Sequence, residues 1–276
     1  MYFISEITVK CMIYIVKRID EDLDFGCEER AEGAPVMAVV TLMNSSGEGF
    51  IVKAEDAMLY EKEINEGDKV YFDNDNKLEK SMDQTIDYYN LNAENFIENT
   101  QNVDMHQAQD KFLRLLKENA LILDFGCGSG RDTKLFLEKG YRVTATDGSA
   151  EICRFASEFT GIEVKHLLFQ ELSEINSYDG IWACSSILHL PKNELLSVIR
   201  KMCVALKESG IIYTSFKYGD FEGERNGRHF TDFTEDSFQD FIKEVPEIMI
   251  VENWITGDVR PGRGEEKWLN LILQKI

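Results

Sequence analysis

The sequence has little of several features that identify common classes of protein. Its 276 residues carry 30 basic side chains against 50 acidic ones, a formal net charge of −20, and both halves are acidic. It offers no basic stripe for a phosphate backbone or an anionic lipid, so we expect neither nucleic acid nor membrane as a partner. Residues 1–16 are apolar but contain Glu6 and Lys10, so they are too short and too polar to span a bilayer. A buried pair of strands, or a misassigned start upstream of Met12, is favoured over a targeting segment.

Cysteine motifs are also missing. The six cysteines are scattered along the chain and no two of them form a CxxC pair: Cys11, Cys27, Cys127, Cys153, Cys184 and Cys203. Zinc-ligand spacing is therefore absent, and a disulfide framework is not expected in a chain of this length. We expect no bound metal and a reduced, cytoplasmic location.

Residues 1–80 and 81–276 differ in texture, which predicts two domains. In the first, the apolar runs 35–43 and 50–56 flank the turn sequence NSSGEG, and other short runs follow. This pattern predicts a small β-rich, barrel-like domain of four to six strands, whose role we leave open beyond dimerisation or covering of a site. The polar stretch 73–81 is the best linker in the sequence.

From about residue 82, helical patterns alternate with short buried strands. Helices are expected at 82–100, 104–120, 132–140, 150–161 and 190–210, with a further one near 233–245. Strands are expected at 121–126, 141–147, 162–169, 180–186 and 210–216, followed by two closing strands with no helix between them. This order predicts an α/β domain with a doubly wound, mostly parallel, Rossmann-like sheet of seven strands that ends in an antiparallel hairpin.

The strongest chemical signal is LILDFGCGSGRD, residues 121–132. A buried strand runs into Asp124, then into Gly126, Gly128 and Gly130, and then into a helix. Glycines at such a turn let the backbone approach a ligand closely. The G-x-G-x-G spacing differs from the G-x-G-x-x-G that seats a pyrophosphate, and a carboxylate two residues before the first glycine suits a ligand that carries an ammonium group.

The second signal is Asp147, which ends the next strand 21 residues after Gly126. An acid at this position accepts hydrogen bonds from both hydroxyls of a ribose. With the glycine turn, it indicates a ligand that contains adenosine.

These segments, together with YDGIWACSSILHLP (178–191), resemble class I S-adenosylmethionine-dependent methyltransferases. GCGSGRD and the preceding YYNLNAENF (88–96) are most similar to the small tellurite-resistance-type branch. The resemblance covers residues 82–276, about 70% of the chain, and leaves the N-terminal region outside it.

The resemblance implies a set of cofactor contacts. Asp124 would orient the glycine loop and the amino group of the ligand, and the glycines would make room for the methionyl portion. Asp147 would hold the ribose, with Gly148 beside the adenine. Gln170 and Glu171 would contact the adenine amino group. Ala183 and Cys184 would face the methionine part and the reacting sulfonium, and Tyr89, in the leading helix, would close over the cofactor.

Two familiar motifs are absent after the fourth strand of this domain. ACSS stands where amino-group methyltransferases of adenine or glutamine carry [DN]PP[YF], and no Pro-Cys nucleophile of a cytosine C5 methyltransferase is present. Cys184 is interpreted as a small buried residue rather than as a nucleophile.

Polar residues gather where the family places its methyl acceptor: Lys217, Tyr218, Arg225, Arg228, Arg260 and Arg263. They predict a pocket for a carboxylate or phosphate on the acceptor, the alternative being surface pairing with Glu222, Glu224, Glu265 and Glu266. His189 and His229 are candidate general bases, although His189 also suits a hydrogen bond at a helix start.

The sequence thus predicts methyl transfer from S-adenosylmethionine to an oxygen, nitrogen or sulfur of a small, anionic acceptor, leaving S-adenosylhomocysteine. Two alternatives stay open: a regulatory protein that binds S-adenosylmethionine without catalysis, and a nicotinamide-dependent oxidoreductase. A homodimer is one option for the assembly.

Overall fold

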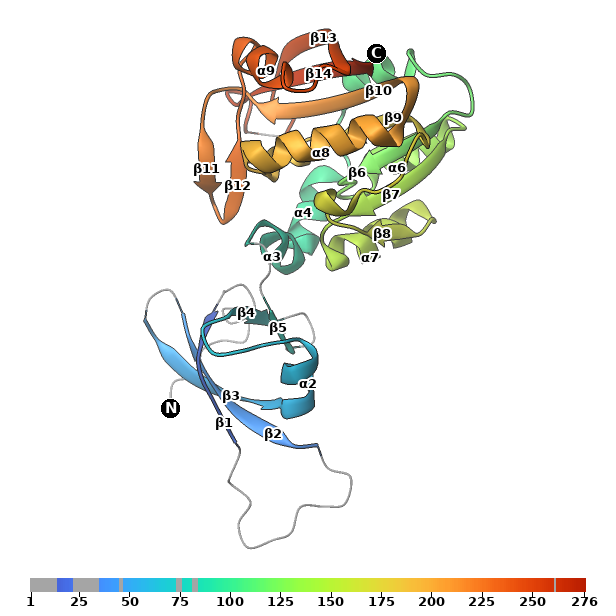
Figure 1. Cartoon of the computed structure of the whole chain (residues 1–276). Coiled ribbons are helices and arrows are strands. Elements are labelled where there is room, and N and C mark those ends of the chain that lie inside the picture. The colour runs from blue at the N-terminus through green and yellow to red at the C-terminus, as the bar shows by residue number, and fades with distance from the viewer. Residues whose placement is uncertain (1–13, 22–34, 45–46, 73–75, 81–83, 261) are drawn as a thin grey trace, which may run out of the picture. The chain divides into compact units, whose positions relative to one another are not determined.

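The computed structural model describes residues 14–21, 35–44, 47–72, 76–80, 84–260 and 262–276. The chain divides into two compact units, residues 1–92 and residues 93–276, which are described separately (Figure 1). This division lies twelve residues beyond the expected boundary, because helix α3 (Gln84–Leu91) groups with the first unit. The expected strand at the N-terminus falls largely outside the described residues.

The first unit contains an antiparallel sheet of five short strands, within the expected four to six. Their order in space is β3-β2-β1-β4-β5. Their bounds are β1 Tyr14–Glu21, β2 Met37–Met43, β3 Gly49–Glu55, β4 Lys69–Phe72 and β5 Leu78–Lys80, and helix α2 covers Asp56–Glu61. Alternate residues of β2 (Ala38, Val40 and Leu42) are buried, as the two-residue period of a one-sided strand requires. Leu59 of α2 joins the same core.

The second unit contains the predicted seven-stranded sheet, with the order β13-β14-β10-β9-β6-β7-β8. The first five strands along the chain run parallel to one another, and the last two form the expected antiparallel hairpin. The bounds are β6 Leu121–Phe125, β7 Arg142–Asp147, β8 Val164–His166, β9 Tyr178–Ala183, β10 Leu206–Lys217, β13 Ile248–Gly257 and β14 Lys267–Lys275.

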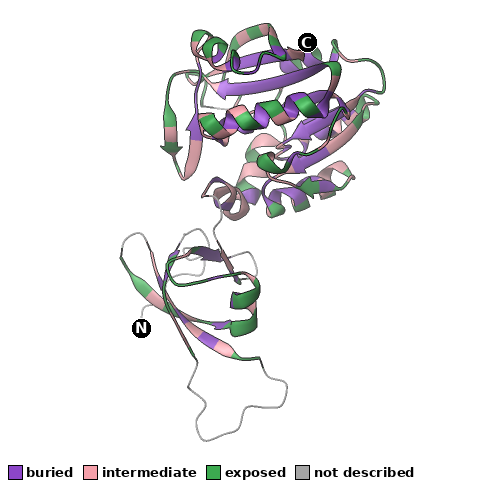
Figure 2. Ribbon diagram, viewed as in Figure 1, coloured by how far each residue is buried: buried purple, intermediate pink, exposed green. Residues whose placement is uncertain are grey.

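Helices flank both faces of this sheet, which makes it doubly wound (Figure 1). They are α4 Ala93–Thr100, α5 His106–Leu113, α6 Arg131–Glu138, α7 Ala150–Thr160, α8 Lys192–Ala205 and α9 Glu235–Ile242, with short 3-10 turns η1 Phe169–Glu171 and η2 Ile187–His189. Neighbouring strand residues point to opposite faces: Trp182 packs with α5 and α6, and Ile181 packs with α8 and α9. The inner strands β6, β9 and β10 are accordingly buried on both sides, whereas the helices keep an exposed face (Figure 2).

Three expected helices are wrong in their bounds. The segment 82–100 forms two helices rather than one, and α5 ends at Leu113, well before residue 120. Helix α8 ends at Ala205 because Leu206 is extended (ψ 142°), fully buried and paired with Tyr178 of β9. Pairing of β10 with the sheet therefore ends this helix before the polar segment that the sequence analysis included in it.

A second hairpin, absent from the prediction, follows β10. Strands β11 (Glu222–Arg225) and β12 (Arg228–Thr231) pair across Asn226 and Gly227, which both have positive φ. Asn-Gly between two strands is the typical signal for a two-residue hairpin turn, so the sequence contained the information.

A candidate cofactor site at the carboxyl edge of the sheet

The glycine loop joins β6 to α6, and its three glycines all have positive φ: Gly126 (+79°), Gly128 (+53°) and Gly130 (+75°). Their surroundings differ. A Cβ on Gly126 would lie 2.5 Å from Cβ of Ser186, and one on Gly130 would lie 2.7 Å from Cγ2 of Thr160. Among the described residues, a Cβ on Gly128 would meet only the ring of Phe96, at 3.1 Å. Gly126 and Gly130 are thus fixed by protein packing, and Gly128 is the glycine bounded by a movable side chain.

Asp147 ends β7, the strand beside β6, so its carboxylate lies at the same sheet edge as the glycine loop. It accepts hydrogen bonds from the backbone N–H of Gly128 and of Ser149, both at 3.0 Å. Burial raises its pKa above the usual value. The neighbouring Gly148 carbonyl is 2.9 Å from Nε2 of His166. Asp147 therefore holds the loop backbone and keeps lone pairs for additional donors.

Asp124 is buried in β6 and accepts a 2.6 Å hydrogen bond from the hydroxyl of Thr133 on α6. Burial, and then the nearby charge of Asp132, raise its pKa well above the ordinary range. Its interaction with Thr133 ties the strand before the loop to the helix after it.

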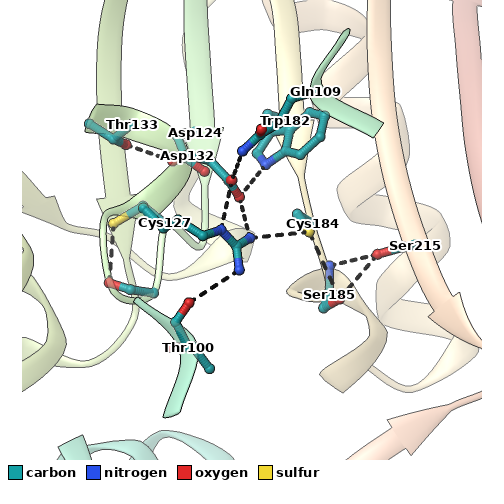
Figure 3. Close-up of polar contacts among 12 residues, drawn as sticks. Thr100, Gln109, Asp124, Cys127, Asp132, Thr133, Trp182, Cys184, Ser185 and Ser215 are labelled. Atoms are coloured by element: carbon teal, nitrogen blue, oxygen red, sulfur yellow. Dashed lines mark hydrogen bonds and ion pairs between the residues drawn. The ribbon is translucent and has the colours of Figure 1, made fainter. Parts of the chain in front are cut away.

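A buried ion pair lies immediately after the loop, and the sequence analysis missed it (Figure 3). Arg131 donates through Nε and Nη2 to the two carboxylate oxygens of Asp132, at 2.9 and 2.7 Å. The same carboxylate accepts from Gln109 Nε2 at 2.6 Å and from Trp182 Nε1 at 2.8 Å. The letters R and D directly after GCGSG were the signal, since adjacent opposite charges at the start of a helix are easily taken as surface groups.

Two further contacts place the guanidinium of Arg131. Its Nη1 donates to the carbonyl of Thr100, the last residue of α4, at 3.3 Å, and Nη2 lies 4.0 Å from Sγ of Cys184 at the end of β9. Ala183, just before it, is fully buried. Burial raises the pKa of Cys184 to about 12, so it is a neutral thiol at physiological pH, which agrees with its interpretation as a packing residue.

The other predicted cofactor residues lie nearby or in the other unit. Gln170 and Glu171 are exposed in η1; Gln170 Nε2 donates to Glu194 Oε2 at 2.7 Å, and Glu171 Oε2 accepts from the N–H of Leu168 at 2.8 Å. Tyr89 belongs to the first unit, where its ring lies edge-on to Tyr88 at 5.5 Å. Its closing role stays a prediction. Among the described residues, no group of three or more His, Cys, Asp or Glu side chains is arranged to hold a metal ion.

Comparison with known proteins finds relatives of part of the larger unit. Residues 122–210 match the family model described as a methyltransferase domain. YqeM of Bacillus subtilis (strain 168), named as a methyltransferase, is 32% identical over 116 residues, which are 38% of this chain and 47% of that protein. Residues 122–210 of the larger unit thus resemble a methyltransferase domain. The chain spans about half the length of YqeM.

Solved structures support the fold of the larger unit. The 1,6-didemethyltoxoflavin-N1-methyltransferase of Burkholderia thailandensis, solved with 1,6-didemethyltoxoflavin and S-adenosylhomocysteine, has a TM-score of 0.54 and 21% identity, over 77% of this chain and 97% of that one. The N-methyltransferase NodS of Bradyrhizobium japonicum WM9, solved with S-adenosylhomocysteine, has a TM-score of 0.52 and 17% identity, over 66% and 96% of the two chains. In the parts of the chain that are described, no helix is long and apolar enough to cross a membrane.

The arginines of the expected acceptor pocket pair largely with aspartates. Arg225 makes two hydrogen bonds to buried Asp232, at 3.1 and 2.7 Å, and Arg260 makes two to buried Asp258, at 2.9 and 2.5 Å. Although burial acts in the opposite direction, the hydrogen bonds from Arg260 lower the pKa of Asp258 to about 2. These two guanidinium charges are therefore neutralised within the larger unit.

The remaining predicted acceptor residues lie around the same loops. Glu266 pairs with Lys217 and, at 4.0 Å, with Arg263. The guanidinium of Arg228 lies 5.2 Å from the ring centre of Phe230, and Tyr218 is partly exposed at the end of β10. The alternative interpretation expected such pairing with carboxylates, and Glu266 is one of the partners that it named. Arg225 and Arg260 instead pair with aspartates.

His189 connects the β11–β12 hairpin to the turn after β9. Its Nδ1 lies 2.6 Å from the carbonyl of His229, which fixes Nδ1 as the protonated nitrogen, and its ring packs edge-on against Phe230. His229 Nε2 lies 3.3 Å from Oγ1 of Thr231. Burial lowers the pKa of His189 to about 3, so it is neutral at physiological pH and a weak base.

We expect His189→Asn to reduce the pH dependence of stability in acid. The unfolded histidine binds a proton below about pH 6.5, while the folded residue stays neutral to about pH 3, so folding stability declines as the pH falls between these values. The decline attributable to this residue is at most about 1.4 kcal/mol per pH unit. Asparagine keeps a donor for the His229 carbonyl but does not titrate. Urea unfolding at pH 7.0, 6.0 and 5.0 should show a smaller loss for the variant; equal losses would contradict a neutral, buried His189.

Proposed function

We propose that this protein transfers a methyl group from S-adenosylmethionine to a small-molecule acceptor. The observation that carries the proposal is the buried Asp147 carboxylate, held against the N–H of Gly128 where two adjacent parallel strands end. Ligands of open α/β sheets bind at this carboxyl edge. Asp147 has the acceptor capacity for two ribose hydroxyls, and the glycine loop is beside it.

The charges around the loop suit the methionyl end of this cofactor. Arg131 would bring a partly buried cation toward its carboxylate. A bound ammonium or sulfonium group would in turn favour the ionised form of Asp124, whose pKa is raised by burial. Gln109 Oε1 is buried and has no hydrogen-bond partner among the described residues, which marks unused acceptor capacity next to the loop. Gly148, Gln170 and Glu171 would line the adenine, and Ala183 and Cys184 would line the methyl-bearing sulfur.

Bound S-adenosylmethionine supplies an electrophilic methyl on a sulfonium, which an acceptor oxygen, nitrogen or sulfur attacks in line. The protein's task is then to align the acceptor and to exclude water. A base is needed only where the acceptor must lose a proton. Of the two candidate bases, His189 is neutral and weakly basic, and its Nδ1 proton is committed to the His229 carbonyl, so we propose a positioning task for it. His229 is the better candidate base.

The acceptor need not be anionic. Arg225 and Arg260 have buried aspartate partners, so an anion would compete with existing ion pairs. Lys217, Tyr218, Arg228 and Arg263 remain proposed contacts. The Burkholderia protein, which is named as an N1-methyltransferase and was solved with 1,6-didemethyltoxoflavin, is a precedent for a small-molecule acceptor on this fold.

Other parts of the proposal depend on the sequence alone. They are the assignment to the tellurite-resistance-type branch, a cytoplasmic location, homodimer formation and the absence of nucleic acid or membrane partners. A regulatory protein that binds S-adenosylmethionine without catalysis is the alternative. The methyltransferase-type match over residues 122–210 favours the enzyme.

Calorimetry with S-adenosylmethionine, S-adenosylhomocysteine and NAD tests the cofactor. We expect binding of the first two and none of NAD. Incubation with methyl-labelled S-adenosylmethionine and a pool of small metabolites then tests catalysis, with labelled product expected. Binding of NAD alone would overturn the proposal, and cofactor binding without any labelled product across the metabolite pool would favour the regulatory alternative.

A further inference from the structure

Asp132 is the most fully hydrogen-bonded side chain near the proposed site. It is 4% exposed and accepts four hydrogen bonds, two from Arg131 and one each from Gln109 and Trp182 (Figure 3). Against the effect of burial, the charge and hydrogen bonds of Arg131 lower its pKa, so it is a carboxylate. It links the start of α6 with α5 and β9.

This arrangement is not explained by stability alone. A buried ion pair loses much of its Coulombic gain to desolvation, and apolar residues of similar size commonly serve as well in its place. The amide of Gln109 contributes one hydrogen bond but leaves its oxygen buried and without a partner among the described residues, which is unfavourable. Such a compromise is typical of residues retained for a site rather than for folding.

The hydrogen bonds to Asp132 fix the orientation of the Arg131 guanidinium. Neighbouring residues of a helix do not normally face each other, so the pairing of Arg131 with Asp132 fixes the guanidinium in one particular plane. In that plane Nη1 points to the Thr100 carbonyl and Nη2 toward Cys184. Arginine has five N–H donors, and the contacts to Asp132, Thr100 and Cys184 use four of them, which leaves one on Nη1 for a ligand.

We propose that Asp132, supported by Gln109 and Trp182, is a positioning residue that sets Arg131 to bind the methionyl carboxylate of the cofactor. The proposal rests on the proposed function. It predicts that the hydrogen bonds to Asp132 affect which ligand is preferred, and not only the stability of the fold.

The test compares two ligands, S-adenosylmethionine and its decarboxylated analogue, by calorimetry. In the wild-type protein we expect the carboxylate to improve affinity about 10- to 100-fold, the range of hydrogen bonds to charged groups. Asp132→Asn puts an amide NH2 against existing donors and releases Arg131. The preference should then fall to within about threefold, with little change in affinity for the decarboxylated analogue.

Two further variants keep the proposal testable should Asp132→Asn fail to fold. Trp182→Phe removes one donor and keeps an aromatic ring, so it should lower the preference partly. Gln109→Leu removes both the donor and the unpartnered oxygen, so it should lower the preference while the melting temperature stays equal or rises. Asp179→Asn is the control, because Asp179 accepts hydrogen bonds from Leu121 N–H and Lys207 Nζ at the opposite edge of the sheet.

The outcomes separate the two proposals. Wild-type protein that binds neither ligand would overturn the proposed function. Binding of both with equal affinity, or a preference that survives in Asp132→Asn or in the two other variants, would overturn the positioning role alone. If Asp132→Asn lowered the affinity for both ligands by the same factor, and Asp179→Asn did the same, the positioning role would also be overturned. That result would indicate a structural role for Asp132.

Discussion

Replacing Gly126 with alanine is expected to destabilise the larger unit by roughly 2–5 kcal/mol. Part of the loss, about 1–2 kcal/mol, is the cost of holding an L-residue in the left-handed region, since Gly126 has φ +79°. The rest, about 1–3 kcal/mol, comes from overpacking, because the new Cβ would lie 2.5 Å from Cβ of Ser186. Chemical denaturation followed by far-UV circular dichroism measures the total.

Gly140→Ala is the matched control. Gly140 has φ +86°, and a Cβ at this position would meet no atom of the described residues within 4 Å, so this variant should lose only the backbone contribution. The double variant Gly126→Ala/Ser186→Gly should recover part of the stability that overpacking costs. The recovery is reduced by the loss of the hydrogen bond that Ser186 Oγ donates to the carbonyl of Phe125 at 2.7 Å. Equal losses in Gly126→Ala and Gly140→Ala would mean that the contact with Ser186 relaxes without cost.

The different tasks of the three loop glycines show where sequence reasoning stops. The glycine-rich segment predicts a turn between a strand and a helix, and this was confirmed; its three glycines all have positive φ. Ser186 and Thr160, which exclude side chains at Gly126 and Gly130, lie 60 and 30 residues further along the chain. Contacts over such separations depend on how strands and helices pack, and no local pattern reports them.

The fold was predictable because the inner strands β6, β9 and β10 of the seven-stranded sheet are largely buried on both faces. β6 and β9 are short continuous apolar runs, and helical periods separate most of the parallel strands, so strand number, direction and the closing hairpin were confirmed. Helix bounds failed where tertiary pairing overrides local propensity, as at Leu206. The β11–β12 hairpin was not predicted although Asn-Gly is its signal, because the many charged residues of this segment suggested a ligand-binding loop.

The charged residues show the same limit. Expected partners of the loop arginines were glutamates close in sequence, whereas Arg225 and Arg260 pair with Asp232 and Asp258. Both aspartates are nearly fully buried, and burial is a property of the folded chain. The role of Arg131 could not be predicted for the same reason. Its partner Asp132 also accepts hydrogen bonds from Gln109 and Trp182, which belong to α5 and β9, and these contacts exist only in the folded chain.

Asp147→Ala is expected to reduce affinity for S-adenosylhomocysteine about 10- to 100-fold. Loss of hydrogen bonds from a charged acceptor to the ribose corresponds to about 1.5–3 kcal/mol. The variant also leaves the N–H groups of Gly128 and Ser149 without the acceptor they have at 3.0 Å, so the loop itself should loosen. Calorimetry on the folded variant gives the affinity, and thermal unfolding reports the loop contribution.

A ligand change separates the two effects. The 2′-deoxy analogue of S-adenosylhomocysteine lacks one hydroxyl, so wild-type protein should bind it more weakly than the parent. In Asp147→Ala the two ligands should bind alike, because the acceptor for that hydroxyl is gone. Asp179→Ala, which removes a carboxylate that accepts the N–H of Leu121 at 2.8 Å, should lower stability and leave the preference intact. If wild-type protein does not distinguish the two ligands, the ribose is held elsewhere, and the role of Asp147 is confined to the loop backbone that it already binds.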